Sequence, residues 1–145
     1  MAVQLYTKDM GGAASMGDQS LIRVRWNTLA NGDTGAPMPW GEWADRTMHF
    51  WVTNAAGGVS VGGVGGSVSF EGSNDYDPNT GNAGTWTVLN DQLGNALTFA
   101  FSGGAALRQN TEAPLWVRPH VTAGDGTTAC NVVAALRRIQ PMISH

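Results

Sequence analysis

Hydrophobic and polar residues alternate with a period of two along much of the chain. The clearest example is the stretch 67–101, where Val68 and Phe70 alternate with polar residues and the run 97–101 repeats the pattern. Such alternation is typical of a strand with one buried face. The breaks between the runs are rich in Asn, Asp and Gly, which close tight turns. The centre of the chain is therefore predicted to be a meander of short antiparallel strands.

The same pattern predicts strands on both sides of this meander. In residues 20–26, Ile22, Val24 and Trp26 share one face, and arginines occupy the other. Four further strands are predicted at residues 46–53, 103–109, 113–123 and 128–138. No window has a helical period. Seven or eight short strands separated by turn residues favour an all-β fold, an antiparallel β-sandwich of jelly-roll-like type.

Length and composition indicate one domain with two extensions. A chain of 145 residues is one domain by size. Residues 1–19 begin with a strand-like run and continue with small residues that lack periodicity, so we expect an extended N-terminal arm. The sandwich is expected at residues 20–138 and a C-terminal tail at 139–145. Charged residues are only 13%, about half the usual share, which fits either a surface covered by partners or a less soluble, Gly-rich β domain.

The expected arm and one long connection supply the candidate partner contacts. Residues 28–45 contain two prolines and two tryptophans, and a connection of this length is usually functional or packs on itself. Exposed tryptophans would anchor a partner or a sugar, whereas tryptophans folded over the edge of the sandwich would be structural. The residues expected to bind a partner are Leu5, Tyr6, Met10, Met16, Trp40 and Trp43.

Oxygen-bearing side chains at alternate positions form a candidate calcium site. Asp75, Asp77 and Asn79 have a spacing that can converge on Ca²⁺. The glycine that follows comes one place late for an EF-hand loop, and the twelfth position is Trp86 rather than a glutamate. Asx turns at a hairpin tip explain the same residues. Apart from this candidate, we expect no metal and no cofactor.

Several classes of function lack support in the sequence. There is no G-x-S-x-G motif, and the three histidines His49, His120 and His145 do not cluster, so we expect no enzymatic activity. The net charge is −3 with a single lysine, which argues against nucleic-acid binding. No segment is apolar over the ~18 residues of a membrane span. The N-terminus lacks a signal peptide pattern and Cys130 is alone, so we expect synthesis in a host cytoplasm without an intrachain disulfide.

Two units of the sequence resemble small structural proteins of tailed phages. Residues 67–75 (SVSFEGSND), followed by TWTVL at 85–89, are similar to a strand–turn–strand unit in those proteins. A later unit, EAPLWVRPHVT at 112–122 with GDGTT and a closing strand that ends in ALRR, is similar to a second one. The likeness covers roughly residues 67–138, about half of the chain. This chain departs from the short form of the first unit by the insertion 76–84.

The resemblance implies a virion-associated β-sandwich protein, a group that includes capsid decoration (cement) proteins. In such proteins the sandwich sits on the shell and an arm runs along neighbouring capsid subunits. The implied role is binding to the major capsid protein on the capsid surface, as a homo-oligomer such as a trimer, to stabilise the head. Two alternatives stay open. One is a tail or fibre-base component, and the other is a carbohydrate-binding module that uses Trp40, Trp43 or Trp116 as a stacking platform.

Overall fold

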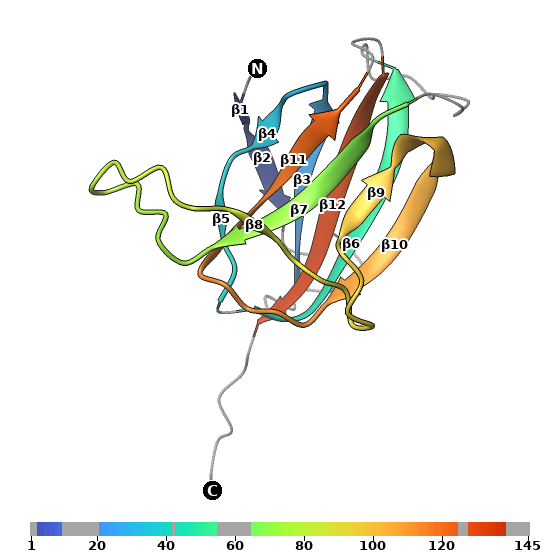
Figure 1. Ribbon diagram of the computed structural model, residues 1–145. Coiled ribbons are helices and arrows are strands. Elements are labelled where there is room, and N and C mark those ends of the chain that lie inside the picture. The colour runs from blue at the N-terminus through green and yellow to red at the C-terminus, as the bar shows by residue number, and fades with distance from the viewer. Residues whose placement is uncertain (1–2, 10–20, 42, 55–64, 125–127, 139–145) are drawn as a thin grey trace, which may run out of the picture.

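The computed structural model describes residues 3–9, 21–41, 43–54, 65–124 and 128–138. Within these ranges the chain forms two β-sheets that pack face to face, with one short 3₁₀ turn at Phe101–Gly103 (η2). Figure 1 shows the two layers and the long strands that cross the molecule. The predicted all-β sandwich is confirmed. In the described part of the chain, no helix is long and apolar enough to cross a membrane.

The larger sheet has seven strands and contains the predicted central meander. Its longest members, β7 and β11, pair antiparallel, and β7 also pairs with both β8 and β9. The strand β1 pairs parallel with β4, whereas the other pairings in this sheet are antiparallel. The strands are β1 (Val3–Gln4), β4 (Thr34–Gly35), β5 (Met38–Pro39), β7 (Ser67–Ser73), β8 (Thr87–Val88), β9 (Thr98–Ala100) and β11 (Trp116–Ala123).

The smaller sheet has five strands in the order β10-β6-β12-β3-β2, all antiparallel. Its central strand is β12, the last strand among the described residues, which pairs with β6 on one side and β3 on the other. The strands are β2 (Tyr6–Asp9), β3 (Leu21–Leu29), β6 (Trp43–Asn54), β10 (Ala105–Asn110) and β12 (Thr128–Arg138).

The core lies between the sheets and contains the residues that the alternation placed inward. From the larger sheet come Val68 and Phe70, and from β3 comes Trp26, whose ring meets the ring of Phe70 edge-on with centroids 6.0 Å apart. Cys130 is fully buried, and this burial raises the pKa of its thiol to about 12. The other inward residues of β3, β6 and β12 are also buried: Ile22, Val24, Met48, Phe50, Val52, Val132, Ala134 and Leu136.

The start of the chain, expected as an extended N-terminal arm, pairs with both sheets over residues 3–9. The strand β1 joins the larger sheet and β2 joins the smaller one, so residues 3–9 cross from one layer to the other. The ring of Tyr6 packs edge-on against Trp26, with centroids 5.7 Å apart. Met10, Met16 and the tail 139–145 lie outside the described residues, so the boundaries at residues 19 and 139 stay predictions.

Candidate functional site

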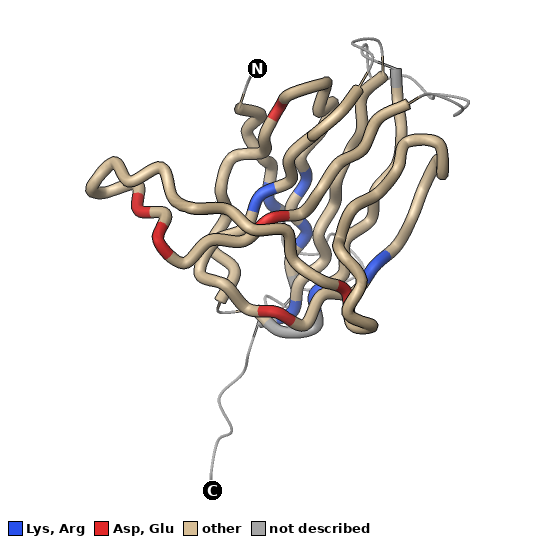
Figure 2. The backbone as a smooth tube through the Cα atoms, in the orientation of Figure 1, with Lys and Arg blue, Asp and Glu red and all other residues tan. Residues whose placement is uncertain are grey.

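The loop between β7 and β8, residues 74–86, projects from the sandwich on the left of Figure 1. Acidic positions, red in Figure 2, lie along the arm of the loop that follows β7. Its tip closes as a small hairpin, in which Asp77 and Asn82 exchange backbone hydrogen bonds of 3.1 and 3.0 Å. The insertion 76–84, where the sequence departs from the phage-like unit, therefore builds this tip.

Asp75 holds the two arms of the loop together. The Ser73 hydroxyl donates to Asp75 Oδ1 (2.8 Å), and Thr85 donates to Oδ1 through its backbone N–H (2.6 Å) and to Oδ2 through its hydroxyl (2.9 Å). The backbone N–H of Thr85 is the largest of the causes that lower the pKa of Asp75. Hydrogen bonds to the ionised form favour that form. The carboxylate is thus engaged by the loop itself.

The calcium candidate has the geometry of local turns. Asp77 Oδ1 accepts the backbone N–H of Asn79 at 2.8 Å, as in an Asx turn. Asp75 and Asp77 therefore both accept hydrogen bonds from the loop itself. Among the residues that the structure describes, no group of three or more His, Cys, Asp or Glu side chains is placed to hold a metal ion. The alternative explanation by Asx turns accounts for the arrangement.

Acid should loosen this loop. The pKa of Asp75 is lowered from its ordinary value of 3.8. The ionised carboxylate therefore stabilises the folded loop fully above pH 3.8, and this stabilisation is lost as the pH falls through the lowered pKa of the folded state. We expect the amide proton of Thr85 to move toward a solvent-exposed shift in an NMR titration from about pH 5 to about pH 2. The variant Asp75→Asn should lack this transition. An unchanged Thr85 signal in the native protein would contradict the assignment.

Three aromatic residues anchor the loop on the sheet. The ring of Tyr76 lies 5.6 Å from Trp86 and 5.0 Å from Trp116, measured between centroids. The indole N–H of Trp86 donates to the carbonyl of Ala83 at 2.9 Å, and the guanidinium carbon of Arg118 lies 4.2 Å from the Trp86 ring centroid. Each of these rings therefore contacts another ring of the group, and Trp86 also contacts Arg118.

A buried carboxylate lies next to this aromatic group, on the outer face of the larger sheet. The side chain of Glu71 is only 7% exposed. It lies between two residues of β11, with Oε1 2.6 Å from His120 Nδ1 and Oε2 3.7 Å from Arg118 Nη2. The strand register brings these groups together, because Arg118 is opposite Glu71 and His120 is opposite Ser69. Since Arg118 also stacks on Trp86, the ion pair links the sheet to the projecting loop.

Sequence reasoning found part of this cluster. The alternation within residues 113–123 puts Arg118 and His120 on the face opposite Val117 and Val121, which are buried in the core. The burial of Glu71 was missed, because a glutamate that alternates with Val68 and Phe70 is expected to face water. The only sequence signal was that outward positions of two predicted strands carry opposite charges, and the sequence does not show which strands pair.

Of the expected partner residues near the N-terminus, the structure describes Leu5 and Tyr6. Leu5 is 82% exposed, whereas Tyr6 is half-buried against the core. The backbone around them is fixed, since the Gln4 carbonyl accepts the N–H of Ala36 at 2.8 Å and the Gln4 side chain donates to Asp33 at 3.1 Å. Leu5 is therefore an aliphatic side chain held at the surface by an ordered strand segment.

Trp40 and Trp43 are not surface anchors, and the expectation that they bind a partner is wrong. Their exposed fractions are 0% and 1%. The indole N–H of Trp40 donates to Asn110 Oδ1 (3.3 Å) and to the Glu112 carbonyl (3.2 Å). The connection 28–45 packs on itself and contributes β4, β5 and the start of β6. A carbohydrate platform built on these two rings is not present.

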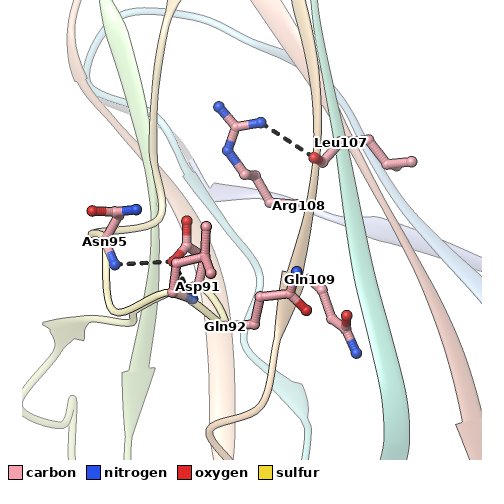
Figure 3. Close-up of a pocket in the computed structure, with 7 residues that line it drawn as sticks. Asp91, Gln92, Asn95, Leu107, Arg108 and Gln109 are labelled. Atoms are coloured by element: carbon pink, nitrogen blue, oxygen red, sulfur yellow. Dashed lines mark hydrogen bonds between the residues drawn. The ribbon is translucent and has the colours of Figure 1, made fainter.

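Two hollows lie on either side of β10. The first, of 340 Å³, lies between β10 and residues 91–95 of the loop that precedes β9 (Figure 3). Asp91 holds this loop, because its Oδ1 accepts the backbone N–H groups of Leu93 (2.8 Å) and Asn95 (2.9 Å). The bond from Asn95 is the largest cause that lowers the pKa of Asp91. The second hollow, of 290 Å³, lies on the outer face of the smaller sheet, between Arg25 and Leu107.

Comparison with known proteins adds only general likenesses. No protein-family model and no curated protein matches the chain. Among solved structures, the SPBc2 prophage-derived protein YomS is similar at 11% identity over 79% of this chain and 94% of that chain, with a TM-score of 0.47. A cupin 2 domain-containing protein from Halorhodospira halophila is similar at 11% identity over 97% and 69% of the two chains, with a TM-score of 0.39. At these identities and scores the likenesses say nothing about function.

Proposed function

We propose that this chain is a structural virion protein of a tailed phage, a capsid decoration protein that binds the major capsid protein and stabilises the head. It acts as a homo-oligomer on the capsid surface and performs no catalysis. The sequence resemblance over residues 67–138 supports the virion role. The structural observation that carries the proposal is the exposed Leu5 on a segment tied to both sheets.

This segment presents apolar surface in an unusual way. Val3 and Leu5 are 62% and 82% exposed, whereas Gln4 and Tyr6 between and after them are turned toward the sandwich. Burying one leucine side chain in an interface contributes roughly 1.5–3 kcal/mol. Because hydrogen bonds already order the backbone here, little conformational entropy is lost on binding. The pair is therefore suited to contact a protein surface such as a capsid subunit.

A tail or fibre-base location is the second candidate. The projecting loop 74–86 favours it, because a rigid protrusion held by Asp75 and Tyr76 can fit between subunits of a neighbouring ring. Electron microscopy of the particle separates the two candidates by position. Density on the shell supports the decoration role, and density on the tail replaces it with the alternative.

The proposal predicts that Leu5→Asp removes the protein from the particle. We expect at least a ten-fold loss of bound copies on virions that lack the native protein, since about 1.5–3 kcal/mol of apolar burial is lost and a charge is buried. Leu115→Asp is the matched control, because Leu115 is also exposed, at 56%, but lies away from the N-terminal segment. Full occupancy by the Leu5 variant would contradict the proposed contact. Deleting the first residues is a poorer test, because it removes β1 and β2.

A further inference from the structure

The open edge of β10 is a structural feature without a described partner. Among the described residues β10 pairs only with β6, and its other side ends the smaller sheet at the right of Figure 1. At six residues it is longer than the other described strands that pair on one side only, which have two to four residues: β1, β2, β5, β8 and β9. Exposed edges of this length are templates for pairing with another chain.

The pairing register shows which backbone groups are open. The N–H of Val52 donates to the Gly104 carbonyl at 3.0 Å, and the register then continues without a bulge through Ala106 opposite Phe50. Hydrogen-bonded and non-hydrogen-bonded pairs alternate in an antiparallel ladder. Ala106 and Arg108 therefore bond to β6, whereas Leu107 and its neighbours two residues away, Ala105 and Gln109, direct their N–H and C=O groups to the open edge.

The surroundings of this edge have two different chemical characters. On one face the Leu107 side chain is 65% exposed and, as Figure 3 shows, points away from Arg108. On the other face lies the polar hollow, where the Arg108 Nη1 donates to the Leu107 carbonyl at 3.2 Å. A side-chain N–H thus occupies the position that a backbone N–H of an added strand would take. Arg108 makes no other hydrogen bond to the described residues, although its charge is among the causes that lower the pKa of Asp91 in the same hollow. Its remaining N–H groups are donors that a further carboxylate can use.

We propose that the edge of β10 binds an extended segment of a partner protein in which apolar and acidic residues alternate, added as a sixth strand of the smaller sheet. Backbone hydrogen bonds to Ala105, Leu107 and Gln109 provide the pairing, as in other cases of strand addition. Apolar side chains of the segment lie beside Leu107. Acidic side chains on the opposite face enter the polar hollow and pair with Arg108.

A peptide titration of the full-length protein in solution tests this site. The probe is a capped seven-residue peptide in which valine and glutamate alternate, and the readout is amide exchange and chemical shift by NMR. We expect the amides of Leu107 and Gln109 to exchange quickly in the free protein and to become protected on saturation, with a Kd on the order of 1 mM or tighter. The amides of Ala106 and Arg108 should be protected in both states. A peptide with the same composition, but with valines and glutamates in separate blocks, is the control.

Variants at Arg108 test the predicted chemistry of the segment. Arg108→Gln should weaken binding of the alternating peptide about ten-fold, the loss expected for one charge-assisted hydrogen bond. Arg108→Lys keeps the charge and should retain most of the affinity. Peptide-induced shifts confined to other strands would overturn the proposal, as would equal binding of the block peptide. If the β10 amides became protected from exchange as the protein concentration rose without any peptide, a second copy of the protein would occupy this edge. That result would also overturn the proposal. No phage particle is needed, so the result is independent of the Leu5 experiment.

Discussion

Replacing Trp40 by alanine should lower the free energy of unfolding by about 3–5 kcal/mol, the usual cost of removing a large aromatic side chain from a core. The ring is fully buried and lies 5.5 Å from the ring of Phe70, measured between centroids. Its removal leaves a cavity in the larger sheet. The change also removes the indole donor to the buried side chain of Asn110. The lost packing and the lost hydrogen bond both destabilise the folded state, whether or not a partner is bound.

Urea unfolding followed by circular dichroism measures this effect. The control is Trp116→Ala, because Trp116 is only half-buried and lies at the base of the projecting loop, so a smaller loss of about 1–2 kcal/mol is expected. The experiment also separates two roles for Trp40. Normal stability together with lost particle binding would restore the interpretation of Trp40 as a partner anchor and contradict its structural role.

Replacing Glu71 by alanine should cost about 2–3 kcal/mol of stability. Breaking a fully buried ion pair costs more, but the side chains of Arg118 and His120 are 22% and 31% exposed and can be partly hydrated. The change removes the 2.6 Å hydrogen bond with His120 Nδ1 and the 3.7 Å ion pair with Arg118, whose buried Nε already lacks a hydrogen-bond partner. Without Glu71 its guanidinium has no carboxylate beside it, and its packing on Trp86 should weaken.

Two measurements check this prediction. Urea unfolding gives the change in stability, and Glu71→Gln is the matched control, because it keeps the shape and one hydrogen-bond acceptor and should lose less. Tryptophan fluorescence should also change in the alanine variant, since Arg118 leaves the face of Trp86. A variant as stable as the native protein would mean that the cluster does not hold the loop to the sheet.

The parts of the fold that follow from local alternation were predictable from the sequence. In β3, β6 and β12 one face is packed against the other sheet, so every second residue had to be apolar. The alternation for this reason puts residues such as Val24, Phe50 and Val132 on the faces that the structure buries. The meander around β7 followed from the same pattern and from its turn residues.

The rest depended on contacts between distant segments. Trp40 lies in a connection that contains two prolines, which indicates an exposed loop. In the structure its ring is buried, and its indole N–H bonds to residues about seventy positions away. Glu71 is buried only because β11 brings Arg118 and His120 beside it. The first strands were expected in an arm, since two and four residues are too few to reveal that they pair with β4 and β3. In each case the partner strand, which the sequence does not specify, decides the outcome.

The position of β12 at the centre of the smaller sheet has a consequence for biosynthesis. Both neighbours of this strand, β3 and β6, are translated long before it, and they cannot complete their pairing until residues 128–138 have left the ribosome. Sheets dominated by such long-range pairing fold slowly. The nascent chain must therefore remain unaggregated until β12 has emerged, and a product that stops before Thr128 cannot form the complete smaller sheet.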